Sequence, residues 1–179
     1  MTMPVLSLER LKMHLRVDGE SEDAHLQVLL EAAVEYCEHF TGRVLAKRQL
    51  EVRLDGFPPG VLHVPAVPLH GVDSIAYVNR EGDLVTLDAE SYRVIASVEP
   101  PIVLPEGSWP SDVLAAEGSV VLTVTAGYDP LPKSIEQAVL MMCGHYYENR
   151  EVMRERFSRV SEMPFATSAL LYPYKIWSW

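Results

Sequence analysis

Two Cys-x-His pairs are the residues of this sequence best suited to chemistry: Cys37 with His39, and Cys143 with His145. Two cysteines and two histidines form a ligand set that zinc accepts. Each pair, however, lies in a segment with helical spacing, and residues two apart on a helix project about 200° from each other. Neither pair can therefore chelate a metal from one face, and we expect two buried thiols and two outward histidines.

Other catalytic arrangements have no recognisable frame in the sequence. It contains no Gly-x-Ser-x-Gly turn, no Walker loop and no Gly-x-Gly-x-x-Gly segment. Glu148 and Glu151 share a helix face, but a solvated or salt-bridged helix end explains them better than a catalytic carboxylate pair does. We therefore predict no catalytic residue, no cofactor and no metal. A small cytoplasmic enzyme with a site assembled from distant residues stays open as the alternative, followed by a zinc-stabilised module.

The segment Pro132–Glu151 is predicted to be the central helix. Pro132 suits a first helical turn, where its missing N–H is not needed. Apolar residues then recur at the three-four spacing of one helical stripe. The stripe consists of Ile135, Ala138, Val139, Met142, Cys143, Tyr146 and Tyr147. Leu140 and Met141 are apolar outside this stripe, which indicates a helix buried on most of its surface.

Two further helices are predicted near the start of the chain. Ser7 is a plausible N-cap for the first, which ends at Val17-Asp18-Gly19. The second begins after the acidic run Glu20–Asp23 and stops at Gly42. Its core face is formed by Leu26, Leu29, Leu30, Ala33, Cys37 and Phe40. Val28, Ala32 and Tyr36 widen the apolar face beyond what one core contact requires, and so suggest a second partner surface.

Between these helices the hydrophobic period changes from 3.6 to 2, which indicates strands. The expected strands are 50–54, 61–64, a hairpin of 74–78 with 84–87, 92–95, and 119–126. The segment 99–118 is rich in Pro, Gly and Ser and is predicted to be a loop. A last short helix is expected over 164–172, stopped by Pro173.

This order predicts an α+β fold: a small helical bundle, formed by two N-terminal helices and a long C-terminal helix, with an inserted antiparallel β region. We expect a single domain over 1–179, with its helical core in 7–43 and 132–172 and the β excursion at about 48–126. The first and last helices must then pack together.

Composition limits the partners and the compartment. The net charge is −10, with 15 basic and 25 acidic residues, which disfavours non-specific affinity for phosphate backbones. The segment Arg150–Arg159 mixes both signs and indicates a neutralised surface rather than a track for nucleic acid. Two cysteines at buried positions fit a reducing compartment. No signal segment and no apolar run that could span a membrane is apparent, so we expect folding in a cytoplasm.

Several segments, taken in order, resemble the head–tail connector (adaptor, or head completion) proteins of long-tailed bacteriophages. These segments are Leu8–Asp18, Tyr36–Arg43, Thr125–Tyr128, Tyr146–Glu151, and Pro164-Phe165 leading to Leu170–Tyr174. No single segment is specific, and the resemblance rests on the ordered set, which spans nearly the whole chain.

The resemblance implies a structural, non-enzymatic virion protein. Members of this family form a homo-oligomeric ring between the portal and a tail-completion or stopper protein, and DNA passes through the ring without sequence-specific binding. It also implies location in the virion, after folding in the host cytoplasm, and no contact with a membrane. It supplies no catalytic residue.

A ring needs two unlike sticky faces on each subunit, because its contacts are heterologous. We therefore predict interface residues among apolar side chains outside the core stripes and at the aromatic end of the chain, where Trp177 and Trp179 either fold back or anchor in a partner. The predicted interface residues are Val28, Ala32, Tyr36, Leu140, Met141, Trp177 and Trp179.

Overall fold

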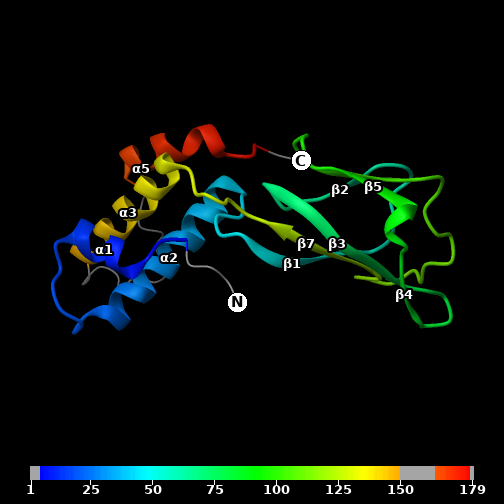
Figure 1. Ribbon diagram of the computed structural model, residues 1–179, viewed down its shortest axis with the longest axis horizontal. Coiled ribbons are helices and arrows are strands. Elements are labelled where there is room, and N and C mark those ends of the chain that lie inside the picture. Colours follow the sequence, from blue (N-terminus) through cyan, green and yellow to red (C-terminus); the bar gives the residue numbers. More distant parts are fainter. Residues whose placement is uncertain (1–4, 150–163, 178–179) are drawn as a thin grey trace. The chain divides into compact units, whose positions relative to one another are not determined.

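The computed structural model of the protein describes residues 5–149 and 164–177. The described residues form two compact units: a helical unit, from 5–45, 129–149 and 164–177, and a β unit, from Ala46 to Tyr128. Figure 1 shows helices in the first unit and strands in the second. The predicted α+β class with an inserted antiparallel β region is confirmed. That the two units act as one connector domain stays a prediction.

The two N-terminal helices form where the sequence predicted them, although the first ends at Leu15, before the expected stop at Val17-Asp18-Gly19. Helix α1 spans Leu8–Leu15, and the Ser7 side chain caps it by accepting a hydrogen bond from the Arg10 N–H at 3.2 Å. Helix α2 spans Asp23–Thr41 and ends at Gly42 with φ of 70°, a left-handed conformation that glycine adopts without a steric penalty. Capping chemistry readable in the sequence therefore sets the start of α1 and the end of α2.

Helix α3, Lys133–Glu148, is the centre of the helical unit. It contacts α1, α2 and a short helix α5, Phe165–Leu171, which continues into a 3₁₀ turn, η2, at Tyr172–Tyr174. Helices from the two ends of the chain thus pack together, since α1 and α2 contact α3 and α2 also contacts α5. The last two residues of the predicted helix, 150 and 151, lie outside the described residues. Every member of the predicted stripe up to Tyr146 is buried, whereas Tyr147 is half-buried.

The β unit contains two antiparallel sheets. Four strands form the first sheet in the order β1-β7-β3-β4: Arg48–Leu54, Val120–Ala126, Leu69–Val78 and Leu84–Thr86. Three strands form the second in the order β2-β6-β5: Leu62–His63, Ile102–Pro105 and Tyr92–Ile95, with a 3₁₀ turn, η1, at Ala89–Ser91 just before β5. The expected hairpin forms between β3 and β4, and β3 begins five residues earlier than expected.

Strand β7 lies between β1 and β3 and shows the alternation that the sequence predicted. Its four residues on one face, Val120, Leu122, Val124 and Ala126, are fully buried, and the residues between them are half-buried. An interior position with neighbours on both sides satisfies the backbone groups along both edges of this strand.

The prediction of a loop over 99–118 is wrong at residues 102–105, which form strand β6. This strand is the middle one of the second sheet, and Val103 pairs with both Leu62 and Val94 and is fully buried. The apolar run is only three residues long and is enclosed by prolines. Because Pro105 stands at the strand end, where a missing N–H is tolerated, the prolines bound the strand instead of preventing it.

Candidate interaction surfaces

The two Cys-x-His pairs do not form a reactive or metal-binding site. Both cysteines are free and buried, as predicted, and burial raises the pKa of each thiol to about 12. A thiol with so high a pKa is not a nucleophile near neutral pH. His39 is exposed and His145 half-buried. Among residues 5–149 and 164–177, no three His, Cys, Asp or Glu side chains are grouped to hold a metal ion.

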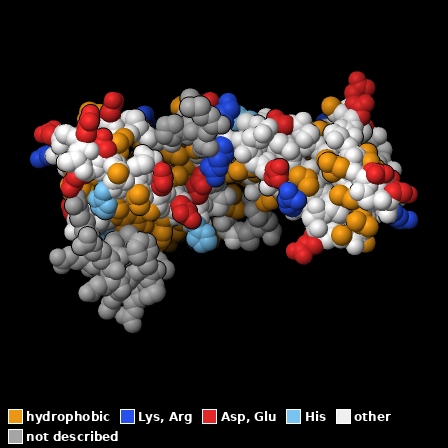
Figure 2. Space-filling view, turned by 90° about the horizontal axis from the view of Figure 1, so that it is seen from below, with side chains coloured by type: hydrophobic (Ala, Val, Ile, Leu, Met, Phe, Trp, Pro, Cys, Tyr) orange, Lys and Arg blue, Asp and Glu red, His pale blue; other side chains and the backbone are white. Residues whose placement is uncertain are grey.

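Helix α2 presents an outer face that mixes apolar and acidic side chains; we call it the α2 outer face and define it as Val28, Glu31, Ala32 and Glu35. Helical spacing places these residues on one side of the helix. Val28 is 60% exposed, both glutamates are exposed, and Ala32 is half-buried. Figure 2 shows hydrophobic side chains gathered on one face of the helical unit with acidic side chains beside them. Tyr36, also predicted at this surface, is half-buried.

The end of the described chain is fastened to the C-terminal end of α2. The Ile176 N–H donates to the Thr41 carbonyl at 2.9 Å, and the Arg43 side chain donates to the Tyr174 carbonyl at 2.5 Å. The Tyr174 hydroxyl also lies 2.8 Å from the hydroxyl of Ser134 on α3. The sequence left open whether the tail folds back or anchors in a partner, and residues 172–176 fold back onto their own unit.

Three aromatic rings and one ammonium group gather at this place; we call Phe40, Tyr172, Lys175 and Trp177 the tail cluster. Tyr172 meets Phe40 edge-on, with ring centroids 5.6 Å apart, and stacks on Trp177 at 6.0 Å. The Lys175 ammonium lies 4.7 Å from the Phe40 centroid and 4.9 Å from that of Trp177, within range for cation–π attraction. Trp177 nevertheless stays 72% exposed. The fold thus holds a large apolar ring in place on the surface.

The sequence singled out Trp177 but not its companions. Phe40 was assigned to the core face of α2, and Tyr172 and Lys175 were treated as the end of the last helix and a tail. The run of aromatic residues at 172–177 was the available signal, but the contact with Phe40 joins residues more than a hundred positions apart. Trp179, the remaining predicted aromatic, lies outside the described residues.

Leu140 does not fit the predicted interface. It is only 1% exposed, so its side chain belongs to the interior of the helical unit, whereas its neighbour Met141 is half-buried. Helix α3 is covered by α1, α2 and α5, which leaves less open surface than a single core stripe would. An interface role for Met141 stays a prediction.

A charged link joins the first turn of α3 to α1. The Glu136 carboxylate, whose side chain is 12% exposed, lies 3.1 Å from the Arg10 guanidinium and 2.5 Å from the Lys133 ammonium. The hydrogen bond from Lys133 lowers the pKa of Glu136 against the opposing effect of burial, and the Arg10 hydrogen bond lowers it further. The ionised form is therefore the one that the folded protein stabilises.

We expect this link to make stability depend on pH. Because the pKa of Glu136 is lower in the folded protein, its contribution is fully present above the ordinary pKa of a glutamate and is lost as the pH falls through the lowered value. Urea unfolding of the wild type and of Glu136→Gln should give free energies of unfolding that differ at pH 7 and converge in acid. A difference that stays constant with pH would contradict this role.

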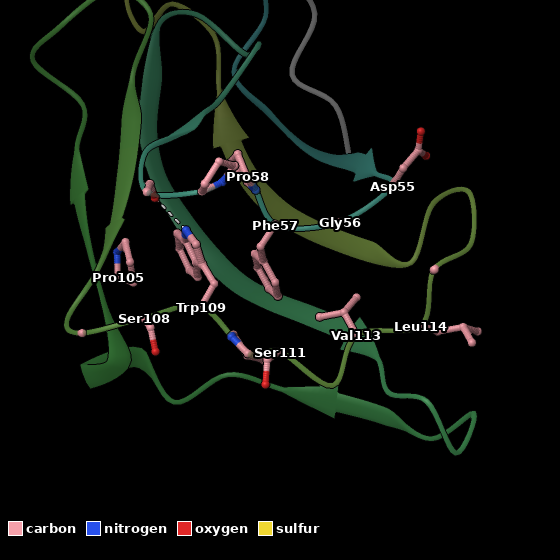
Figure 3. A pocket seen from close by; sticks show the side chains of 15 residues that line it. Asp55, Gly56, Phe57, Pro58, Pro105, Ser108, Trp109, Ser111, Val113 and Leu114 are labelled. Atoms are coloured by element: carbon pink, nitrogen blue, oxygen red, sulfur yellow. Dashed lines mark hydrogen bonds between the residues drawn. The ribbon is translucent and has the colours of Figure 1, made fainter.

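The β unit carries an open pocket of about 600 Å³ between the turn 55–60 and the segment 105–115. Phe57 and Trp109 stack in it with centroids 4.7 Å apart, and Tyr77 meets Phe57 edge-on. The indole N–H of Trp109 donates to the Gly60 carbonyl at 2.7 Å, which Figure 3 shows as a dashed line. This pocket was not predicted, because one of its walls lies in the segment 99–118, which was predicted to be a loop.

None of the helices in the part of the chain that the structure describes is long and apolar enough to cross a membrane.

Comparison with curated proteins gave no match. A comparison with family models matched the Phage gp6-like head-tail connector protein over residues 5–83, a little under half of the chain. This range includes α1, α2 and the strands up to the β3–β4 turn.

Solved structures of similar fold cover far more of the chain. One is described as the neck of an empty GTA particle computed with C6 symmetry: TM-score 0.79, 24% identity, 96% of this chain and 89% of that one. A second, the virion of a native gene transfer agent (GTA) particle, gives 0.77 and 25% over the same shares. A third, the neck of a native GTA particle computed with C12 symmetry, gives 0.71 and 23% over 98% and 94%.

The fold of these chains matches this one over nearly its whole length, and the family match covers both N-terminal helices, where the sequence resemblance begins. The descriptions of these structures name the neck and the virion of GTA particles. The resemblance of this chain to the gp6-like head–tail connector proteins is therefore confirmed.

Proposed function

We propose that the protein is a structural component of the neck of a phage-like particle, where copies of it form a ring between the portal and the tail. The observation that carries this proposal is the match of residues 5–83 to a head-tail connector family within a chain whose fold is that of GTA neck proteins. The C6 and C12 symmetries of two of the similar structures support an arrangement in a ring. The two units then act as one connector domain.

The proposed ring continues the channel through which DNA passes. A conduit must not hold its cargo, and a net charge of −10 on each copy repels phosphate backbones. We propose that the partners are further copies of the chain, the portal protein and a tail-completion or stopper protein. The subunit folds in the host cytoplasm and enters the virion on assembly.

The proposed role requires no catalysis. Both thiols are buried, and the described residues offer no grouped metal ligands. No observation favours the alternative of a small enzyme with a site assembled from distant residues, so we infer a non-enzymatic protein.

Assembly of the full chain tests this proposal. Mass photometry and negative-stain electron microscopy of the purified protein, alone at high concentration and beside the portal protein of the same particle, should reveal closed rings. A gel-shift titration should give a Kd for duplex DNA weaker than about micromolar at physiological salt. A chain that stays strictly monomeric under both conditions would overturn the ring, and tight, steeply salt-dependent DNA binding would overturn the conduit.

A further inference from the structure

We infer that in the ring, the existence of which rests on the proposed function, the tail cluster of each copy docks on the α2 outer face of the next copy. The inference assigns one contact, between two surfaces of the helical unit, and names the residues on each side. It leaves the β unit and its pocket to other partners.

The tail cluster has the properties of a preformed docking surface. Trp177 and Tyr172 are 72% and 47% exposed, yet each ring is held by a neighbouring ring or by the ammonium of Lys175. The hydrogen bonds of the Ile176 N–H and of the Tyr174 carbonyl fix the backbone beneath them. Ordering the rings in advance lowers the entropy that association costs, and exposed tryptophan and tyrosine are the residues most often found as anchors at interfaces.

The α2 outer face has the complementary composition. It offers an apolar strip, Val28 and Ala32, to the rings, and the carboxylates of Glu31 and Glu35 flank this strip. The tail cluster offers aromatic area with one positive charge at its centre. An ammonium group of one copy facing carboxylates of another steers the encounter and fixes the register of the contact.

The tail cluster and the α2 outer face are complementary and belong to the same helical unit, so we infer that the partner of each is a second copy of the chain. Like surfaces brought together would place lysine against lysine, or glutamate against glutamate, so each surface pairs with the unlike surface of the other copy. Phe40 and Val28 lie twelve positions apart on one helix, roughly 18 Å at 1.5 Å per residue, so one copy can use both surfaces at once. Unlike surfaces that bind two different neighbours at the same time generate a ring when the rotation between copies closes, as the proposed function requires.

Charge reversal tests the contact between the tail cluster and the α2 outer face. The variants are assayed under the conditions in which the wild type assembles, alone or beside the portal protein. Lys175→Glu should weaken assembly roughly tenfold or more, measured as the concentration at which half of the protein is assembled. The variant Glu31→Lys/Glu35→Lys should weaken it likewise, and combining all three substitutions should restore assembly. The matched controls Arg93→Glu and Glu81→Lys/Glu90→Lys make the same changes of charge on the β unit and should assemble as the wild type does.

Disulfide formation tests the topology of the same contact. Val28→Cys and Trp177→Cys, mixed and oxidised, should yield a disulfide-linked dimer that neither variant forms alone, and the native thiols do not interfere because they are buried. The inference is overturned if wild-type rings form but the combined variant assembles no better than Lys175→Glu, or if the mixture yields no linked dimer. Failure of the wild type to assemble at all, alone or with portal, overturns the proposed ring instead.

Discussion

The Gly127→Ala variant is expected to lose at least about 4 kcal/mol of unfolding free energy, a large fraction of the stability of a typical domain. Gly127 has φ of 118°, a conformation that residues with a side chain rarely adopt. A Cβ added there would lie 2.3 Å from the carbonyl oxygen of Ala46 and 2.5 Å from the backbone nitrogen of Lys47. Because both atoms belong to the backbone, no change of rotamer can relieve the clash.

Urea unfolding followed by far-UV circular dichroism measures this loss, and Gly71→Ala is the matched control. Gly71 lies on β3, whose partner strand β7 leads directly into Gly127. An added Cβ at Gly71 would meet none of the described atoms within 4 Å, so this change should stay within about 1 kcal/mol. Equal losses in the two variants would show that the close approach to Ala46 is not what makes glycine necessary.

The sequence predicted the end of a strand at residue 126, but it did not show why the next residue must be glycine. The end of β7 and the segment before β1 are brought together by a parallel bridge between Ala46 and Tyr128. The Gly127 N–H donates to the Pro68 carbonyl at 2.9 Å, and His70 Nε2 lies 2.7 Å from the Gly127 carbonyl oxygen. The residues that crowd Gly127 are thus about sixty to eighty positions away in the chain. Local patterns indicate a break, whereas the close approach belongs to the tertiary structure.

The features that the sequence predicted well depend on neighbours along the chain. The cap at Ser7, the left-handed stop at Gly42 and the alternation along β7 each follow from contacts within one element or between adjacent residues. Strand β6 was missed because it is stabilised by pairing with β2 and β5 on either side. This pairing is not visible in the local sequence, in which the prolines indicate a loop. The sequence predicted a helical core from both ends of the chain and a β excursion from its middle, as in the two compact units, but within one domain.

Of the two candidate surfaces, the sequence likewise indicated the α2 outer face but not the tail cluster. Periodicity on α2 identified Val28 as an apolar residue in excess of the core, and the structure leaves it exposed. The tail cluster could not be predicted, because it depends on a tail that returns to Phe40 and is fixed there by Thr41 and Arg43. Helical spacing shows which residues share a face, but it does not show how many other elements cover that helix.

On helix α3, helical spacing alone placed the buried Leu140 at the interface. Substitutions at Leu140 and at its neighbour Met141 test whether each side chain is interior. Leu140→Ala should destabilise the protein by about 2–5 kcal/mol, because the side chain is fully buried and its removal leaves a cavity. Met141→Ala, at the next position on the same helix, should cost about 1 kcal/mol or less, because Met141 is half-buried. Urea unfolding of each purified variant at low concentration, where assembly does not contribute, gives both values.

The result decides how assembly assays on this helix are interpreted. If Leu140 is interior, Leu140→Glu abolishes rings by unfolding the subunit and carries no information about the interface. Met141→Glu, in contrast, should leave the subunit folded. Any loss of assembly in this variant then reports on the surface of α3. A Leu140→Ala variant as stable as the wild type would show that its neighbours do not depend on the side chain, and would return Leu140 to the set of interface candidates. Substitutions at the exposed residues Val28 and Trp177 avoid this ambiguity, because neither side chain supports the fold from within.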